Sequence, residues 1–141
     1  MTPIVLDASI ALAWCFADEA SAYAEAVLAA LAEREALVPA IWPLEIANAL
    51  AVAERQKRIR QPDVSRYLEL LNGLAIQQDA LSVSESVGNV LPLARAYRLS
   101  AYDAAYLDAA IRNDAPLATL DRSLADAGRR AGAEIFPGPR R

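Results

Sequence analysis

Short, mostly apolar segments that end in an acidic residue are the feature that most constrains the fold of this chain. The first apolar segment covers residues 3–6 and is followed by Asp7, and the clearest later one covers residues 116–120 and is followed by Asp121. An apolar run of this length is typical of a strand in a parallel sheet that helices cover on both faces. We therefore expect two buried strands, each with a carboxylate at its tip.

The segments between these strands have the spacing of amphipathic helices. We expect helices over residues 8–16, 20–35, 43–57, 63–73, 84–97, 102–113 and 122–130. Further short strands are expected at residues 37–40, 76–81 and 134–136. Strands that alternate with helices predict an α/β fold with a central, mostly parallel sheet. With 141 residues the chain has the length of a single domain, residues 1–141.

Two more acidic residues lie on apolar helix faces. Glu45 shares a stripe with Ile41 and Val52, and Asn48, three residues further on, lies beside it and can hold it in position. Asp103 lies in the first turn of its helix, where the helix dipole stabilises negative charge. Simpler interpretations stay open, namely a tolerated surface acid for Glu45 and an N-terminal charge for Asp103.

Taken together, the four acids predict a metal site. Carboxylates at buried positions cost several kcal/mol unless something compensates their charge, and four of them in one fold repel each other unless a cation lies among them. The chain has no histidine and one cysteine, so its candidate ligands are oxygens, which suit Mg²⁺ or Mn²⁺ better than zinc. In parallel sheets, sites form at the carboxyl ends of strands. This indicates metal-assisted phosphate chemistry at Asp7, Glu45, Asp103 and Asp121.

Several residues near these acids have two interpretations. Ser9 and Thr119 each lie two positions from a strand-end acid and can support it with a hydroxyl, although helix capping by Ser9 is equally simple. Asp108 is turned by about 140° from Asp103 around the helix, so we expect it at the surface. Asp126 is either a secondary ligand or an exposed helix residue. Cys15 is expected to be an inert, buried thiol.

The charge pattern is unusual for a protein that binds nucleic acid, because the net charge is −4. The basic residues are unevenly spread, and the groups that could hold phosphates are Arg55, Lys57, Arg58, Arg60 and Arg66, then Arg122, Arg129 and Arg130, and finally Arg140 and Arg141. A solvated helix end is the simpler interpretation of any single arginine. No apolar run approaches the roughly 20 residues that span a bilayer, and we expect a cytoplasmic protein with no membrane partner.

Four motifs carry a resemblance to a known family. They are Val5-Leu6-Asp7-Ala8-Ser9, then the segment 42–50 with Glu45 and Asn48, then 100–106 with Asp103, and finally 118–121 with Thr119 and Asp121. In this order they resemble the PIN-domain ribonucleases, and within that family the VapC-type toxins of bacterial toxin–antitoxin pairs.

The resemblance implies an α/β/α sandwich, an endoribonuclease activity that depends on Mg²⁺ or Mn²⁺, a homodimer, and inhibition by a cognate VapB-type antitoxin. It also implies that the four acids ligate the metal and that Ser9, Asn48 and Thr119 support them. We expect the partner helix of the antitoxin to bind between the helices at 20–35 and 42–56, which are rich in small and apolar residues.

Other functions are compatible with parts of the pattern. A PIN-like fold that only binds RNA or protein is the main alternative, since a fold does not guarantee activity. A phospho-acceptor receiver domain would need a lysine near a late strand end, and the only lysine, Lys57, lies in a basic helical run. A phosphatase of the haloacid-dehalogenase type would need an acid where Ser9 stands.

Overall fold

The computed structural model describes residues 1–137 and contains a four-stranded sheet in which every neighbouring pair of strands is parallel. The strand order is β3-β2-β1-β4. The strands are short: β1 Ile4–Leu6, β2 Ala36–Val38, β3 Ile76–Gln78 and β4 Leu117–Ala118. Because all four strands are parallel, their carboxyl ends meet at one edge, where the site is expected.

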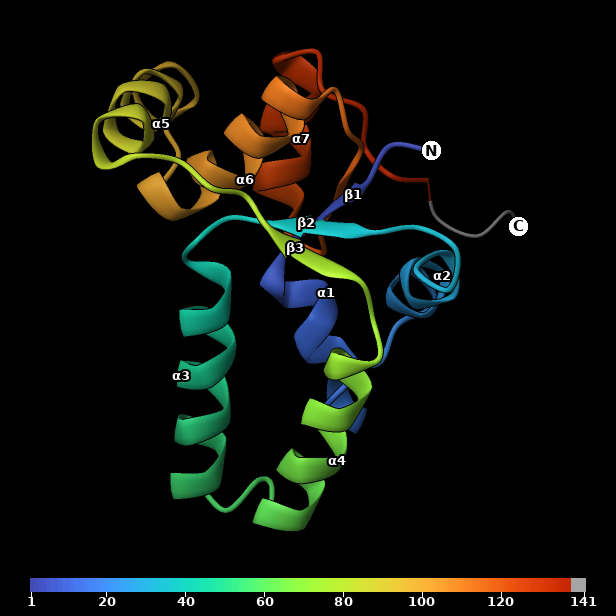
Figure 1. Ribbon diagram of the computed structural model, residues 1–141. Coiled ribbons are helices and arrows are strands. Elements are labelled where there is room, and N and C mark those ends of the chain that lie inside the picture. Colours follow the sequence, from blue (N-terminus) through green and yellow to red (C-terminus); the bar gives the residue numbers. More distant parts are fainter. Residues whose placement is uncertain (138–141) are drawn as a thin grey trace.

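Helices cover both faces of this sheet, as the sequence predicted. They are α1 Ala8–Ala13, α2 Ala22–Ala30, α3 Trp42–Arg55, α4 Gln61–Asn72, α5 Val83–Tyr97, α6 Ala101–Asn113 and α7 Arg122–Arg130, with a short 3-10 helix, η1, at Ala17–Glu19. Figure 1 shows α1, α3 and α4 below the sheet and α5, α6 and α7 above it. The predicted three-layer α/β/α sandwich is therefore confirmed.

The core explains why β1, β2 and β4 are apolar throughout. Ile4, Val5 and Leu6 of β1 are fully buried, and so is Leu117 of β4. A strand enclosed by helices on both faces has no solvent side, so alternation of polar and apolar residues is lost. Asp7 directly follows β1 and is still buried, whereas Asp121 follows β4 at the surface.

The structure differs from the sequence prediction at the last strand. Residues 134–136 do not form a strand of their own, because only Ile135 pairs with Leu117 in a single parallel bridge. β4 is two residues long and offers no further backbone to extend that pairing. The second helix is also shorter than predicted: Ser21 caps α2, and the chain leaves the helix after Ala30.

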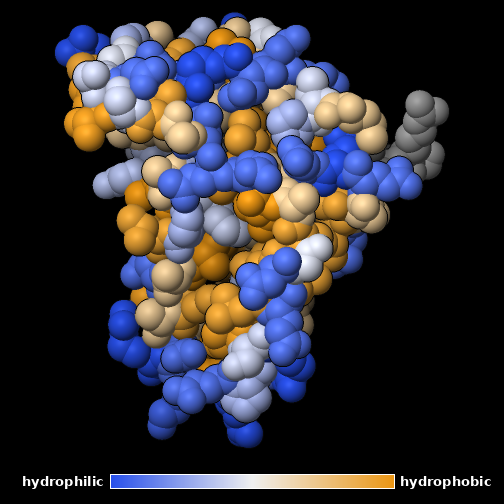
Figure 2. Space-filling view, in the orientation of Figure 1, coloured by the Kyte–Doolittle hydropathy of each residue, from blue (hydrophilic) through white to orange (hydrophobic). Residues whose placement is uncertain are grey.

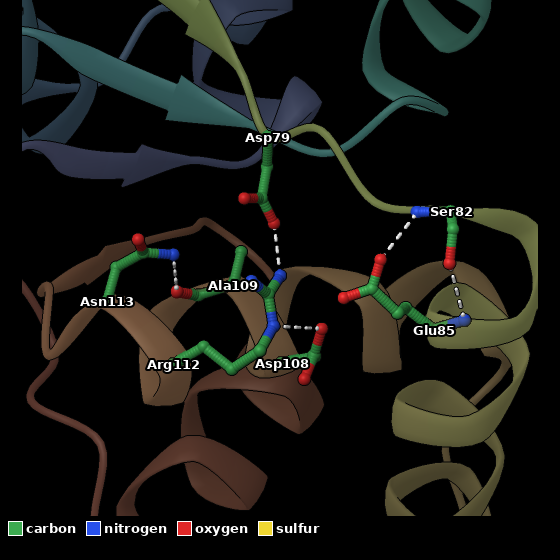
Figure 3. Close-up of polar contacts among 7 residues, drawn as sticks. All are labelled: Asp79, Ser82, Glu85, Asp108, Ala109, Arg112 and Asn113. Carbon is green, nitrogen blue, oxygen red and sulfur yellow. Dashed lines mark hydrogen bonds and ion pairs between the residues drawn. The ribbon is translucent and has the colours of Figure 1, made fainter.

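Asp108 is the clearest error of the sequence prediction, because it is buried and not at the surface. Its residue is 5% exposed, and the Nε of Arg112 donates a hydrogen bond to its carboxylate at 2.8 Å. A second guanidinium nitrogen of Arg112 donates to Asp79, which follows β3 (Figure 3). The helical spacing failed because α6 packs against both α5 and the sheet, so more than one of its faces is buried.

Two further expectations need correction. Cys15 is half-buried, and burial raises the pKa of its thiol. The helices proposed to form the partner groove, α2 and α3, lie on opposite sides of α1, which contacts both (Figure 1). They therefore form no common groove.

An apolar groove instead separates α3 from α4. It has a volume of about 420 Å³, and its lining includes Trp42, Ile46, Leu50, Leu68 and Leu71. Figure 2 shows hydrophobic surface in the hollow between these two helices. Within residues 1–137, every helix is too short or too polar to cross a membrane.

Candidate active site

The four acids come from four separate elements that meet at the carboxyl edge of the sheet. Asp7 joins β1 to α1, Glu45 lies in the first turn of α3, Asp103 lies in the first turn of α6, and Asp121 caps α7 after β4. Their charges act on one another: Asp121 raises the pKa of Asp7 and of Asp103, and Asp7 with Asp103 raises the pKa of Glu45. The fold therefore gathers residues that are up to 114 positions apart, from 7 to 121, into one acidic cluster.

Asp7 is the most deeply placed member of this cluster. It is 7% exposed, and burial is the main cause that raises the pKa of its carboxyl. The hydroxyls of Thr119 and Ser9 oppose that shift, because they donate hydrogen bonds to Oδ2 at 2.6 and 2.8 Å. The structure thus places both predicted supporting hydroxyls against Asp7.

The same two hydroxyls tie the tip of β1 to the loop that follows β4. Ser9 Oγ accepts a hydrogen bond from the backbone N–H of Leu120 at 3.1 Å, and Thr119 Oγ1 accepts one from the N–H of Asp121 at 3.0 Å. Each hydroxyl therefore donates to Asp7 and accepts from the β4 side. This arrangement fixes the position of Asp7 relative to Asp121.

Tyr106 is a site residue that the sequence reasoning missed. Its side chain is fully buried, and its hydroxyl donates a hydrogen bond to Glu45 Oε1 at 2.5 Å while accepting one from the N–H of Ala8 at 3.4 Å. Burial and the contact with Glu45 raise the pKa of the Tyr106 hydroxyl far above its usual range, so it stays a neutral donor. Its position one helical turn after Asp103 is the only signal of this role in the sequence.

Asn48 was predicted to hold Glu45 in position, and the structure shows no such contact within residues 1–137. It is exposed, and among residues 1–137 its amide makes no hydrogen bond with Glu45. Tyr106 holds that carboxylate instead. Burial is the main cause that raises the pKa of Glu45, the Tyr106 hydrogen bond opposes the shift, and the charges of Asp7 and Asp103 add to it.

The remaining two acids lie at helix N-termini. Ser100 caps α6 by accepting a hydrogen bond from the N–H of Asp103 at 3.1 Å, and burial is the main cause that raises the pKa of the Asp103 carboxyl. Asp121 Oδ1 accepts hydrogen bonds from the N–H groups of Ser123 and Leu124 at 2.8 and 3.2 Å. Capping therefore fixes the backbone at Asp103 and the side chain at Asp121.

Asp126 lies one turn beyond this cluster on α7. Its side chain is 71% exposed and pairs with Arg129 at 3.3 Å. This position fits the exposed helix residue that was one of its two predicted interpretations.

The acidic cluster fits a divalent cation in the kind of donor it offers. All four side chains are carboxylates, and burial together with mutual repulsion disfavours charge on Asp7, Glu45 and Asp103 in the absence of a compensating cation. In Glu45 and in Asp121, only one of the two carboxylate oxygens accepts hydrogen bonds. Within residues 1–137 the other oxygen of each carboxylate has no hydrogen-bond donor and is available to a cation. As the side chains stand in this part of the chain, no three acids are close enough together to enclose an ion. Binding would therefore require these side chains to move towards one another.

The predicted phosphate-holding arginines fall into different environments. Arg58 lies over the ring of Phe16 at 4.5 Å and pairs with Asp18 and Glu19 at 3.2 Å, at the far ends of α3 and α4 from the acids. Arg122 directly follows Asp121 at the start of α7, and Arg129, in the last turn of α7, lines the same hollow as Asp121. Arg140 and Arg141 lie outside the described residues.

Comparisons with known proteins agree with this geometry. The sequence model of the PIN domain matches residues 4–130, and the chain belongs to the PIN-domain family. Ribonuclease VapC3 of Pyrobaculum aerophilum is 32% identical over 123 residues, which cover 87% of this chain and 92% of that protein. The crystal structure of PAE2754 from the same organism has the same fold, with a TM-score of 0.67 and 24% identity over 89% of this chain and 79% of that one.

Proposed function

We propose that this protein is an endoribonuclease of the VapC type, dependent on Mg²⁺ or Mn²⁺, and the toxin of a toxin–antitoxin pair. The observation that carries the proposal is the convergence of four carboxylates from four elements, where burial and the neighbouring negative charges raise the pKa of Asp7, Glu45 and Asp103. The relative named ribonuclease VapC3, similar over nearly its whole length, supports the assignment to RNA.

In this proposal Asp7, Asp103 and Asp121 hold the metal ion and Glu45 completes the site. A bound divalent ion lowers the pKa of a water molecule and polarises a phosphoryl oxygen. The chain's own contribution is to keep the donors in place: Thr119 and Ser9 hold Asp7, and Tyr106 holds Glu45. The chain has no histidine, so no imidazole is available as general acid or base.

A pair of isosteric substitutions tests the proposal. Asp7→Asn removes the charge of the buried donor, and we expect loss of RNA cleavage with Mg²⁺ or Mn²⁺ while the thermal unfolding transition is kept. Asp18→Asn makes the same chemical change on a carboxylate that is 74% exposed and pairs with Arg58 far from the acidic cluster, and it should cut RNA like the wild type. Near-normal cleavage by Asp7→Asn would contradict the assignment. An intact protein that binds RNA but cuts none in any metal would be the inactive binding module instead.

The partner proposal follows from the apolar groove between α3 and α4. Its lining of Trp42, Ile46, Leu50, Leu68 and Leu71 suits the apolar face of an amphipathic helix from the antitoxin. Leu68 is 44% exposed, so it is available to a partner. Leu68→Asp should abolish co-purification with the small protein encoded beside this one, without loss of RNA cleavage. We also propose a homodimer, which sedimentation of the isolated chain tests.

A further inference from the structure

A hollow lies directly beside Asp121, on the side that faces α7 and α2. It has a volume of about 720 Å³, within the range of about 300–1,000 Å³ that is usual for small-ligand sites. Its lining includes Thr119 and Asp121 from the loop after β4, Arg122 and Arg129 from α7, Tyr23 from α2, and Phe136. We call this set the α7–α2 hollow.

Two guanidinium groups, those of Arg122 and Arg129, line the α7–α2 hollow together with the carboxylates of Asp121 and Asp126. The side chain of Arg129 pairs with Asp126 at 3.3 Å, but both are more than 60% exposed, so water weakens the pair. Arg122 has no ion pair within residues 1–137. Arg112, by contrast, lies between two carboxylates. The α7–α2 hollow therefore has two positively charged side chains that can bind the phosphates of an RNA strand extending from the acidic cluster.

Two aromatic rings, those of Tyr23 and Phe136, also line the α7–α2 hollow. The ring centroids of Tyr23 and Phe136 are 6.4 Å apart, with their planes inclined by 59°. The hydroxyl of Tyr23 donates a hydrogen bond to the backbone carbonyl of Phe136 at 2.7 Å, which holds α2 against the segment after α7. Both residues are half-buried, so part of each side chain stays accessible. Aromatic side chains of this kind stack on unpaired bases.

The α7–α2 hollow and the acidic cluster share one wall. Thr119 and Asp121 line the hollow, and the Thr119 hydroxyl that accepts from the N–H of Asp121 also donates to Asp7 at 2.6 Å. A strand of RNA with one phosphate at Asp7 would thus place a neighbouring nucleotide at Arg122 and Arg129.

We propose that the α7–α2 hollow binds a nucleotide adjacent to the scissile phosphate of single-stranded RNA. The guanidiniums of Arg122 and Arg129 bind its phosphates, and the rings of Tyr23 and Phe136 contact its base. This rests on the proposed RNA cleavage and adds the subsite that positions the substrate. Because the bases of a duplex are paired, the subsite selects single strands.

Binding and cleavage are measured separately to test this. The probe is a short fluorescein-labelled single-stranded RNA of mixed sequence, titrated in Asp7→Asn to prevent cutting, over a range of salt concentrations. The double variant Arg122→Gln/Arg129→Gln should weaken RNA binding about tenfold. The plot of the logarithm of the binding constant against the logarithm of the salt concentration should become less steep, by about one to two in slope. Phe136→Leu should weaken it about tenfold with an unchanged salt slope. In the cutting background the same changes should raise KM more than they lower kcat.

Arg66→Gln is the matched control, because Arg66 also pairs with an aspartate three residues away, Asp63, on an exposed helix face. Arg66→Gln removes one positive charge outside the α7–α2 hollow. Because the loss of a single distant charge has a small effect, this variant should bind RNA within about twofold of Asp7→Asn alone. If Phe136→Leu fails to fold, as judged by thermal unfolding, Tyr23→Leu takes its place.

The possible results separate this subsite from the proposed function. If the wild type cleaves RNA, but the α7 variants bind RNA as tightly as the Arg66→Gln control, the subsite is wrong and the proposed function stands. Absence of both cleavage and RNA binding would overturn both proposals. RNA binding that is lost in the α7 variants, without any cleavage by the wild type, would support the subsite in a non-catalytic protein.

Discussion

Replacing Tyr106 by phenylalanine removes one hydroxyl from the centre of the acidic cluster and leaves the buried ring in place. That hydroxyl donates to Glu45 at 2.5 Å and accepts only a long contact, 3.4 Å, from the N–H of Ala8. A hydrogen bond to a charged group contributes about 1.5–3 kcal/mol. Glu45 is half-buried and regains some water when the donor is lost, so we expect a loss of about 1–2 kcal/mol in the free energy of unfolding.

The assay is a double-mutant cycle with Glu45→Ala, followed by thermal unfolding in the presence of a chelator. Tyr106→Phe alone should lower Tm by about 3–6 °C for a chain of this size. In the Glu45→Ala background the same change should have little effect, which gives a coupling energy of about 1–2 kcal/mol. In a separate titration, loss of the group that orients Glu45 should weaken Mn²⁺ binding about tenfold.

Tyr67→Phe is the matched control for Tyr106→Phe. Tyr67 is another buried tyrosine whose hydroxyl donates to an oxygen, the backbone carbonyl of Ala11, away from the acidic cluster. Tyr67→Phe should lower the free energy of unfolding by an amount similar to that for Tyr106→Phe, but it should bind Mn²⁺ like the wild type. A coupling energy near zero between Tyr106 and Glu45, or equal Mn²⁺ affinities of Tyr106→Phe and Tyr67→Phe, would refute the role given to Tyr106.

Three further predictions follow from the same contacts. Burial raises the pKa of Asp7 above its ordinary 3.8, so the folded state binds a proton on this carboxyl more tightly than the unfolded state does. In metal-free buffer, protonated Asp7 should therefore add its full contribution to stability below pH 3.8, and this contribution should be lost as the pH rises through the raised pKa. Asp7→Asn should remove this component in urea titrations at several pH values, and identical pH profiles would contradict the assignment. Arg112→Met leaves Asp79 and the buried Asp108 unpaired and should cost about 3 kcal/mol in urea unfolding, whereas a loss below about 1 kcal/mol would count against the pairing. Thr119→Val removes the donor to Asp7 and should weaken Mn²⁺ binding about tenfold in calorimetry, and unchanged affinity would show that the hydroxyl is dispensable.

The sequence predicted those features that local pattern determines. The apolar runs before Asp7 and Asp121 indicated buried parallel strands, because enclosure on both faces removes alternation along the strand. The same runs placed both acids at the carboxyl edge of the sheet. The positions of Glu45 and Asp103 in apolar helix faces indicated that they point inward, and the structure brings their charges within range of Asp7.

Other features depend on packing between distant segments, which no local pattern carries. Tyr106 resembles an ordinary core residue in the sequence, because its hydrogen-bond partner Glu45 is 61 positions away. Asp108 was placed at the surface by helical spacing, yet α6 is enclosed by two neighbours. The helices expected to share a groove, α2 and α3, do not lie side by side, because α1 separates them (Figure 1).

The position of a bound Mn²⁺ ion tests the central claim most directly. Crystals of the protein soaked in Mn²⁺ should show an anomalous difference peak among the four acids, within coordination distance of Asp7, Asp103 and Asp121, and Asp7→Asn crystals should lack it. A wild-type crystal without a peak at these carboxylates, while the soaked protein cuts RNA, would contradict the account.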